Sequence, residues 1–439
     1  MLKATVTREA GLWKRGVLWL LFLGPLFFAS YGFANWFSSL RNDVGVIVYA
    51  WEAHIPLLPW TIIPYWSIDV LYGLSFLLPA TRYEMDRHAF RLLTVQVICV
   101  VCFLLWPLTI SFNRPELTGV FGAMFDVLMG FDKPFNQAPS LHIALLVVLW
   151  TRFSEHLDAR WLPLLHIWFG LIALSVLTTW QHHFIDLPTG ALVGLLCLWL
   201  WPTAQPSPLK NMQLTNSPQR RRLGLRYLAG ASALAVLAFV LGGIYLWLLW
   251  PAVSLLIVGL NYLFFGVQGF QKQADGRLSP GAWGLLAPYL LGAWINSRVW
   301  TRNAPDPVHV LDNVWLGRIP ARKSLGNVDG LLDLCAELPA NVSGKPYINL
   351  SVLDLTAPSK QTCQAAAQGI EELRLHGAVL VYCALGYSRS ATAIVAWLLE
   401  TGRSTTLEQA LACVRRANPN VVLTPAHMAV LTQLDRAEY

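Results

Sequence analysis

The chain has 439 residues, of which 55% are hydrophobic and only 13% are charged. A soluble globular protein carries about 25% charged residues, so this composition excludes a chain that is soluble throughout, and also a disordered or coiled-coil protein. The formal net charge is +7, and the excess of Lys and Arg lies in residues 1–302. Because the long apolar runs lie in the same part, this charge indicates basic loops beside a membrane rather than nucleic-acid binding.

Runs of about 20 apolar residues predict membrane spans. Residues 1–201 are expected to form a six-span membrane domain, with spans near 16–36, 61–79, 92–112, 141–150, 162–178 and 187–201. Residues 202–225 are rich in Pro, Ser and Asn, which predicts a cytoplasmic linker. Residues 226–302 predict a hairpin of two spans, followed by a helix near 281–299 that either crosses the membrane or lies at its interface.

The distribution of Lys and Arg orients these spans. With the N-terminus in the cytoplasm, most loop cations fall on the cytoplasmic side, as the positive-inside rule requires. We therefore expect an integral protein of a bacterial inner (plasma) membrane. Residues 303–439 have the size of an ordinary globular domain. Basic residues near the helix at 281–299, such as Arg298 and Arg318, favour a cytoplasmic position for this domain.

Polar motifs gather in two loops on the outer side of the predicted membrane domain. One loop contains Arg114 and ends at His142, and the other contains His182 and Asp186. A carboxylate that orients an imidazole prepares it as a nucleophile, and a second imidazole can protonate a leaving oxygen. An Arg supplies fixed positive charge for phosphate oxygens. His183, beside His182, is interpreted as a bystander.

With Pro-Ser-x-His at 139–142 and His-x-x-x-Asp at 182–186, residues 16–201 resemble the type 2 phosphatidic acid phosphatase family, in its branch close to inositol phosphotransferases. The roles that this resemblance implies fall on His182 as nucleophile, Asp186 as its orienting group, His142 as general acid, and Ser140 and Arg114 as phosphate contacts. Two cations of the phosphatase branch are replaced here by Pro107 and Val176, which keeps a phosphotransferase as an alternative.

The stretch from Ala378 to Ala391 is the most specific signal in the chain. An aliphatic run ends at Cys383, and Arg389 follows six residues later at the start of a helical pattern. A strand, a loop and a helix N-terminus in that order form a cradle of backbone N–H groups for an anion. This cradle favours the thiolate of Cys383, Arg389 can bind two phosphate oxygens, and Gly386 allows a tight turn.

This Cys-x5-Arg loop resembles that of the protein tyrosine phosphatase superfamily, in its compact dual-specificity branch, and the resemblance covers residues 308–436. The roles that it implies are Cys383 as nucleophile, Arg389 as phosphate ligand, Ser390 as the group that stabilises the leaving thiolate, and Asp354 as the acid that protonates the leaving oxygen. Where the family usually has His before the Cys, this chain has Tyr382.

The sequence thus predicts a multi-span α-helical membrane domain and a C-terminal α/β domain of dual-specificity phosphatase type. The predicted function is a bifunctional phosphatase of phosphorylated lipids, with a His nucleophile in the membrane domain and a Cys nucleophile in residues 303–439. The expected partners are phosphorylated lipids and the bilayer, with a phosphoprotein as a further substrate of the C-terminal domain and no nucleic acid. Both resemblances imply that no metal or other cofactor is needed.

Two alternatives remain open. A lipid phospho-headgroup transferase would show headgroup exchange that depends on an alcohol acceptor, while its C-terminal domain trims the product. A membrane-anchored protein phosphatase would keep its phosphotyrosine turnover after His182→Ala. A purely structural scaffold fits least well, because each of two separate motifs carries a complete set of reactive groups.

Overall fold

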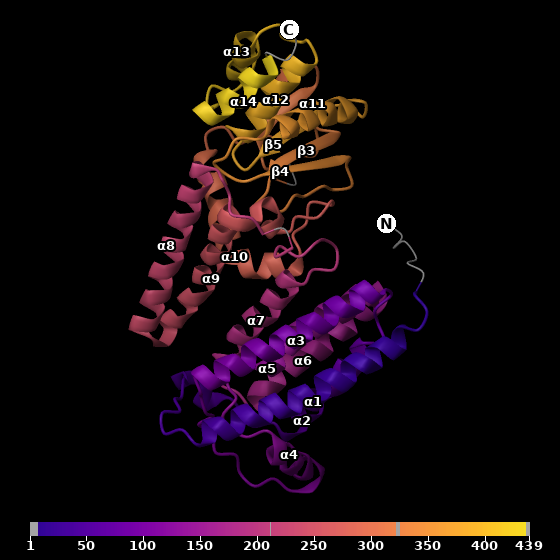
Figure 1. Cartoon of the computed structure of the whole chain (residues 1–439), viewed down its shortest axis with the longest axis vertical. Coiled ribbons are helices and arrows are strands. Elements are labelled where there is room, and N and C mark those ends of the chain that lie inside the picture. Colours follow the sequence, from indigo (N-terminus) through magenta and orange to yellow (C-terminus); the bar gives the residue numbers. More distant parts are fainter. Residues whose placement is uncertain (1–7, 211, 322–324, 436–439) are drawn as a thin grey trace. The chain divides into compact units, whose positions relative to one another are not determined.

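The computed structural model describes residues 8–210, 212–321 and 325–435, and the chain divides into two compact units. The first unit comprises residues 1–207 with 242–244, and the second comprises residues 208–241 with 245–439. The described part of the first unit is helical, whereas the second combines helices with a five-stranded sheet (Figure 1).

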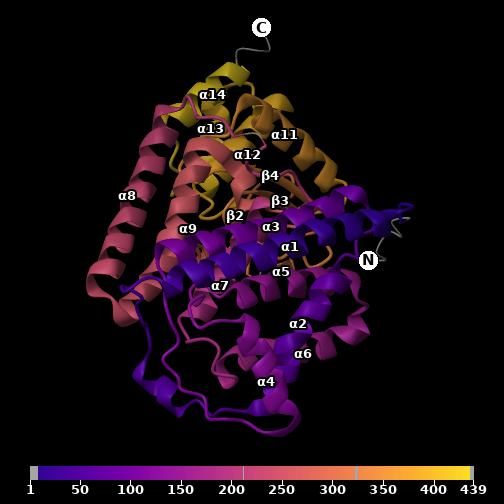
Figure 2. The same cartoon turned by 60° about the horizontal axis from the view of Figure 1, so that its bottom comes forward.

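Seven α-helices build the described part of the first unit. They are α1 (Leu12–Ser39), α2 (Ile62–Ser75), α3 (Arg82–Leu105), α4 (Gly119–Phe131), α5 (Leu141–His156), α6 (Leu162–Thr178) and α7 (Asp186–Leu200). Helix α1 packs along α3, as Figure 2 shows, while α5 packs against both α6 and α7. Helix α4 lies within the predicted outer loop, so part of that loop is helical.

Helices α5 and α7 cross closely because α7 presents two glycines at the crossing. A Cβ atom on Gly190 would lie 2.4 Å from the Ser140 carbonyl oxygen, and one on Gly194 would lie 2.7 Å from that of Ala144. A larger side chain would force the helices apart. The crossing lets the Ser140 N–H donate to the Asp186 carbonyl over 3.1 Å. It thereby joins the starts of the two helices that carry the predicted histidine motifs.

Five helical segments in the described ranges are long and apolar enough to cross a membrane. They are Leu12–Ser39, Arg82–Leu105, Ala159–Thr178, Pro218–Leu241 and Gly243–Phe270. Helices α2 and α5 stand where spans near 61–79 and 141–150 are predicted, but they have 14 and 16 residues. At about 1.5 Å per residue, each is shorter than the roughly 30 Å hydrocarbon core of a bilayer.

Three helices open the second unit, namely α8 (Pro218–Leu241), α9 (Leu249–Leu260) and α10 (Pro280–Trp300). Helix α8 begins within the predicted linker 202–225, with a proline at its first position, where the missing N–H costs no hydrogen bond. Helix α10 continues through Pro288, and α9 packs against both α8 and α10.

The sheet of the second unit has the order β1-β2-β5-β3-β4. Its strands are β1 (Val308–Leu311), β2 (Val314–Arg318), β3 (Gly330–Cys335), β4 (Tyr347–Val352) and β5 (Val379–Cys383). Only the hairpin β1–β2 is antiparallel, and its turn residues Asp312 and Asn313 have φ of 45° and 63°, as a type I′ turn requires. Strand β5 is central, parallel to both neighbours and buried throughout, which explains its uninterrupted apolar sequence.

Helices cover both faces of this sheet. The helices α11 (Lys360–Arg374), α12 (Arg389–Glu400), α13 (Leu407–Ala417) and α14 (Pro425–Asp435) share one apolar core with the sheet. On the opposite face, Leu380 and Tyr382 of β5 belong to a second core, against which Ala293 of α10 packs. Figure 1 shows α10 and the group α11–α14 on opposite sides of the strands. Helix α10 is therefore a structural layer of the α/β domain.

A buried ion pair ties the loop between α9 and α10 to the sheet. Lys272 Nζ lies 2.5 Å from Asp333 Oδ2 of β3 and donates to the Cys335 carbonyl over 2.6 Å. The exposed fractions of the two side chains are 2% and 0%. The Tyr347 hydroxyl also donates to Asp333 over 2.7 Å, so the carboxylate is satisfied without water. Removing one partner would leave a buried charge with too few contacts.

We predict that Lys272→Met destabilises the second unit by about 3 kcal/mol, because Asp333 stays buried without its cation. The apparent midpoint of thermal inactivation of the chain in detergent should fall by about 6–12 °C. The matched control is Arg277→Met, since the pair of the Arg277 side chain with Asp275 is exposed. Equal midpoints for the two variants would contradict the role of the Lys272–Asp333 pair.

Candidate functional site

The Cys383 loop occupies the carboxyl end of the central strand. Cys383 is the last residue of β5, and Arg389 is the first residue of α12. Between them Gly386 has φ of 80°, and a Cβ atom there would lie 2.6 Å from the backbone carbonyl carbon of Gly317 in β2. Only glycine fits this conformation and this close approach. The loop therefore folds tightly against the neighbouring strand.

The Cys383 sulfur is buried among hydrogen-bond donors. Its Sγ accepts from the Gly386 N–H and from the Ser390 hydroxyl, each over 3.3 Å. These contacts stabilise negative charge on sulfur, and they come from the loop and the first turn of α12. Tyr382, at the position where the family usually has His, is fully buried in the sheet.

Two carboxylates hold the Arg389 guanidinium in place. Glu337 accepts from both Nη1 and Nη2, over 2.9 and 2.7 Å, and Asp354 accepts from Nη2 over 2.9 Å. Nη1 also donates to the Val352 carbonyl over 2.7 Å. Burial acts to lower the pKa of Arg389, but Glu337 and Asp354 outweigh it and raise that pKa. Arg389 thus stays charged although it is buried, and its plane is fixed by bidentate pairing.

Asp354 lies in a strained turn after β4. The next residue, Leu355, has φ of 56°, and the Thr356 hydroxyl donates to the Leu353 carbonyl over 2.8 Å. A left-handed Leu costs about 1–2 kcal/mol, so neighbouring contacts must hold the turn. Burial raises the pKa of Asp354, and Arg389 only partly opposes this rise. A carboxyl group with a raised pKa can keep a proton to donate to a leaving group.

The sequence prediction missed Glu337. It lies just beyond β3, the strand beside β5, and its side chain is buried. Because the carboxyl ends of parallel strands meet at one edge of a sheet, an acidic residue after the apolar run of β3 was a usable signal. Cys383, Arg389, Ser390 and Asp354, which the sequence singled out, do converge at this edge.

Helix α10 also contacts the Cys383 loop. The Ser297 hydroxyl donates to the Ala384 carbonyl over 2.6 Å, and the Tyr387 hydroxyl donates to the Trp300 carbonyl over 3.1 Å. Beside these contacts lies a cavity of about 320 Å³. Its lining is formed by Tyr227 of α8, Pro251 and Leu255 of α9, Pro288, Tyr289, Gly292, Ala293 and Asn296 of α10, and Glu337, Asp354, Ala384 and Leu385 of the α/β domain. The cavity thus joins the reactive loops to three apolar helices.

The first unit brings together the predicted histidine motifs. His182 Nδ1 lies 3.1 Å from Asp186 Oδ2, and its Nε2 lies 3.2 Å from the Ser140 hydroxyl. The His183 N–H donates to the same Asp186 oxygen over 3.0 Å. All four side chains are buried. Asp186 thus orients the His182 ring, with Nε2 directed at the start of α5.

His142 and Arg114 are placed by different neighbours. The His142 ring stacks on Tyr65 with ring centroids 4.2 Å apart, and its buried Nε2 has no hydrogen-bond partner among the residues that the structure describes. Arg114 donates to the Thr179 carbonyl from Nε and Nη2, over 3.1 and 2.8 Å. It lines a cavity of about 460 Å³ together with Gln181, the residue before His182. His142 is not among the residues that line this cavity.

The sequence prediction also missed Glu52, which organises the segment around His182. This fully buried carboxylate lies 2.9 Å from His183 Nδ1 and accepts from the Phe184 N–H over 3.0 Å. His183 Nε2 accepts from the Ser111 N–H over 3.1 Å, so both ring nitrogens are occupied. His183 therefore supports the loop, and no local sequence pattern links it to Glu52.

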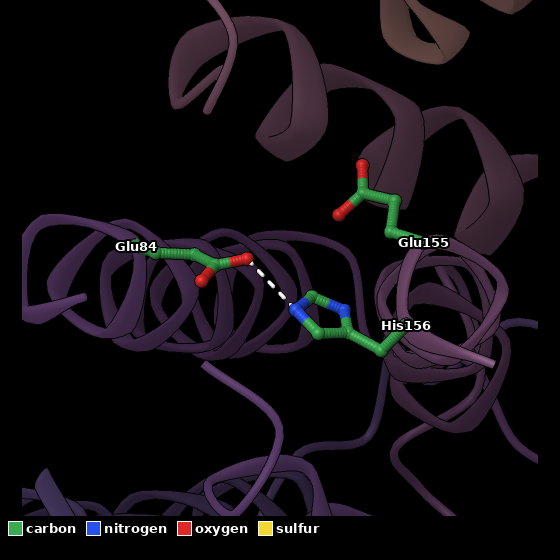
Figure 3. Close-up of side chains that lie close together, drawn as sticks. All are labelled: Glu84, Glu155 and His156. Carbon is green, nitrogen blue, oxygen red and sulfur yellow. Dashed lines mark ion pairs between the residues drawn. The ribbon is translucent and has the colours of Figure 1, made fainter. Parts of the chain in front are cut away.

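A group of possible metal ligands lies elsewhere in the first unit. Ligand atoms of Glu84, Glu155 and His156 all lie within 4.8 Å of one another, and Figure 3 shows Glu84 paired with His156. However, the buried Arg152 guanidinium contacts Glu84 over 2.6 Å and Glu155 over 3.4 Å. Because Arg152 already neutralises these carboxylates, the group is best explained as an ion-pair network.

One family model matches the part of the chain that contains Cys383. Residues 319–437 match the family model for the dual specificity phosphatase catalytic domain. Similar solved structures include Tk-PTP in its active form, with 31% identity over 30% of this chain and 98% of that chain, and a TM-score of 0.28. PTPMT1 in complex with PI(5)P is 20% identical over 30% and 95% of the two chains, also with a TM-score of 0.28. Human DUSP28 is 24% identical over 30% and 96% of the two chains, with a TM-score of 0.27. A comparison with curated proteins finds no match.

The family match covers β3, β4, β5 and the helices α11–α14, together with the Cys383 loop. Residues 319–437 are therefore a dual specificity phosphatase catalytic domain, and the chain is a phosphatase. This domain is the C-terminal α/β part of a chain that is otherwise mostly helical.

We predict that Glu337→Gln lowers kcat/KM for a phosphomonoester by about 10- to 100-fold. A charge-assisted hydrogen bond contributes about 1.5–3 kcal/mol, and without it the Arg389 plane is no longer fixed for the phosphoryl oxygens. The control is Glu400→Gln, since Glu400 is exposed at the end of α12. Unchanged kcat/KM in Glu337→Gln would show that Arg389 does not need this carboxylate.

Proposed function

We propose that the chain is an integral-membrane phosphatase that removes phosphate from phosphorylated lipids at Cys383, and that its first unit carries a second phosphate-cleaving site at His182. The observation that carries this proposal is the cavity beside the Cys383 loop, whose outer wall is formed by α8, α9 and α10. Two of these helices belong to segments long and apolar enough to cross a bilayer. A water-soluble substrate would not need such a wall.

The size of the cavity indicates which part of a lipid it would bind. Small-molecule sites measure roughly 300–1,000 Å³, so a cavity of about 320 Å³ can hold a headgroup with the first atoms of its tails. The remaining tail atoms would stay in the bilayer beside the helices. Pro251, Leu255 and Ala293 offer apolar contacts, while Asn296 can bind a polar headgroup atom.

The reaction proposed at Cys383 proceeds in two steps. The thiolate attacks phosphorus as the bond to the lipid oxygen breaks, and Asp354 gives its proton to that oxygen. Arg389 binds two of the phosphoryl oxygens, one through Nε and one through the Nη2 N–H that Asp354 releases when its carboxyl turns to the leaving oxygen. Ser390 stabilises the sulfur as it leaves. Water then attacks the phosphocysteine, Asp354 takes a proton from it, and inorganic phosphate and the free thiolate are released. The contacts of Ser390 with the sulfur and of Arg389 with Asp354 support this assignment.

The reaction proposed in the first unit uses a histidine nucleophile. His182 Nε2 attacks phosphorus as the bond to the leaving oxygen breaks, Asp186 accepts the hydrogen bond of Nδ1–H, and His142 protonates the leaving oxygen. Water then attacks the phosphohistidine and gives a proton to His142, and inorganic phosphate is released. Ser140 and Arg114 bind phosphate oxygens. The 3.1 Å pair between His182 and Asp186 and the unpartnered Nε2 of His142 among the described residues support these roles. The basic loops favour an outer position for this site and a cytoplasmic position for Cys383.

We expect His182→Ala and Cys383→Ser to abolish the turnover of different substrates. Phosphate release would be measured in detergent micelles from phosphatidic acid, phosphatidylglycerophosphate, a phosphoinositide and an isoprenyl diphosphate. His156→Ala is the control for a histidine in the same unit but outside the site. Loss of all activity in Cys383→Ser with none lost in His182→Ala would contradict a second active site. Headgroup exchange that requires an added alcohol would instead establish the transferase.

A further inference from the structure

We infer that Tyr262 and Gln219 are positioning residues for the general acid, so that α8 and the turn that follows α9 complete the phosphatase site. The inference rests on the proposed role of Asp354 as the acid. The Tyr262 hydroxyl donates to the Asp354 carbonyl over 2.9 Å. The Gln219 amide donates to the next carbonyl, that of Leu355, over 2.5 Å. Two consecutive carbonyls of the acid turn are therefore held from outside the α/β domain.

The acid turn needs such support. Leu355 adopts a left-handed conformation, and its side chain is more than half exposed, so apolar packing does not fix the turn. Within the turn, Thr356 bonds back to Leu353. The carbonyls of Asp354 and Leu355 point outward to Tyr262 and Gln219 instead. These two bonds therefore set the position from which the Asp354 carboxyl reaches the cavity.

The backbone around Tyr262 is specialised for this contact. Residues Asn261–Phe265 form a π-helical turn directly after α9, a feature often found at functional sites. Arg220 of α8 donates to the Tyr262 carbonyl over 3.1 Å and to the Asn261 carbonyl over 3.4 Å. Arg220 thus provides hydrogen bonds to two carbonyls of the wider π-helical turn. These bonds fix the backbone of Tyr262, although Tyr262 lies at the end of a helix.

Aromatic stacking connects this contact to the cavity. Tyr262 is 1% exposed and stacks on Tyr227 of α8, with ring centroids 5.4 Å apart. Tyr227 meets the Tyr289 ring of α10 edge-on at 5.9 Å. Tyr227 and Tyr289 both line the cavity beside Asp354. A lipid bound against these two rings would therefore contact Tyr227, the ring that stacks on Tyr262.

The test measures Tyr262→Phe in the full chain. Every protein also carries His182→Ala, so that the phosphate released comes from the Cys383 site alone. Phenylalanine keeps the ring stack and removes only the hydroxyl. Two substrates are compared in the same micelles, a phosphorylated lipid with an alkoxide leaving group and an aryl phosphate whose phenolate needs no acid. We expect kcat for the lipid to fall about 10-fold with KM unchanged, and the aryl phosphate to be unaffected. Gln219→Ala should act in the same direction.

Two variants separate the possible failures. Tyr245→Phe is the matched control, since Tyr245 lies in the same apolar segment but is half exposed, and it should retain full activity. If Asp354→Asn lowers lipid turnover and Tyr262→Phe does not, the inference is wrong and the proposed function stands. If Asp354→Asn has no effect, Asp354 is not the acid, and that part of the proposed function fails together with the inference; if the parent chain with His182→Ala releases no phosphate from the lipid, the proposed function at Cys383 itself fails. An equal loss on both substrates in Tyr262→Phe would mark Tyr262 as merely structural and overturn the inference.

Discussion

The buried positive charge of Arg389 is the constraint on which the phosphatase site depends. A guanidinium with 2% exposure is stable only if anions surround it, and here Glu337 and Asp354 supply them from the ends of β3 and β4. The same three groups define where a phosphate can bind, because Arg389 is fixed in plane before substrate arrives. Both carboxyl groups contact Arg389, but the pKa of Glu337 is lowered and that of Asp354 is raised, so Asp354 is the one of the two that can hold a proton.

The helices α8, α9 and α10 form part of this site as well as part of the fold. Helix α10 packs on the sheet face opposite α12 and bonds to the Cys383 loop through Ser297. Lys272 anchors the preceding loop to β3, and Tyr262 reaches the acid turn. The apolar segments thus contribute to geometry that the α/β domain would otherwise have to provide with its own loops. This arrangement explains why the cavity opens beside apolar side chains.

Sequence alone could predict those parts of the sites that are contiguous. The Cys-x5-Arg loop is read directly, because strand, loop and helix follow one another, and His182 and Asp186 are only four residues apart in the sequence. Glu337, Glu52 and Tyr262 could not be linked to their partners, because they lie 52, 131 and 92 positions away from Arg389, His183 and Asp354. The predicted linker 202–225 extends too far, because the polar residues at the start of α8, from Pro218 onward, are helical. The close crossing of α5 and α7 at Gly190 and Gly194 could not be predicted either. A glycine within a helix does not by itself show that another helix packs against it.

The most direct test of the account is the preference of the Cys383 site for a lipid over its headgroup. In the His182→Ala chain, kcat/KM would be measured for phosphatidic acid and for glycerol 3-phosphate in identical micelles. Burial of about four methylene groups against α8, α9 and α10 contributes about 3 kcal/mol, so the lipid should be favoured on the order of 100-fold. Equal kcat/KM for the two substrates would show that the helical wall of the cavity does not bind the tails, and would contradict the assignment of a lipid substrate.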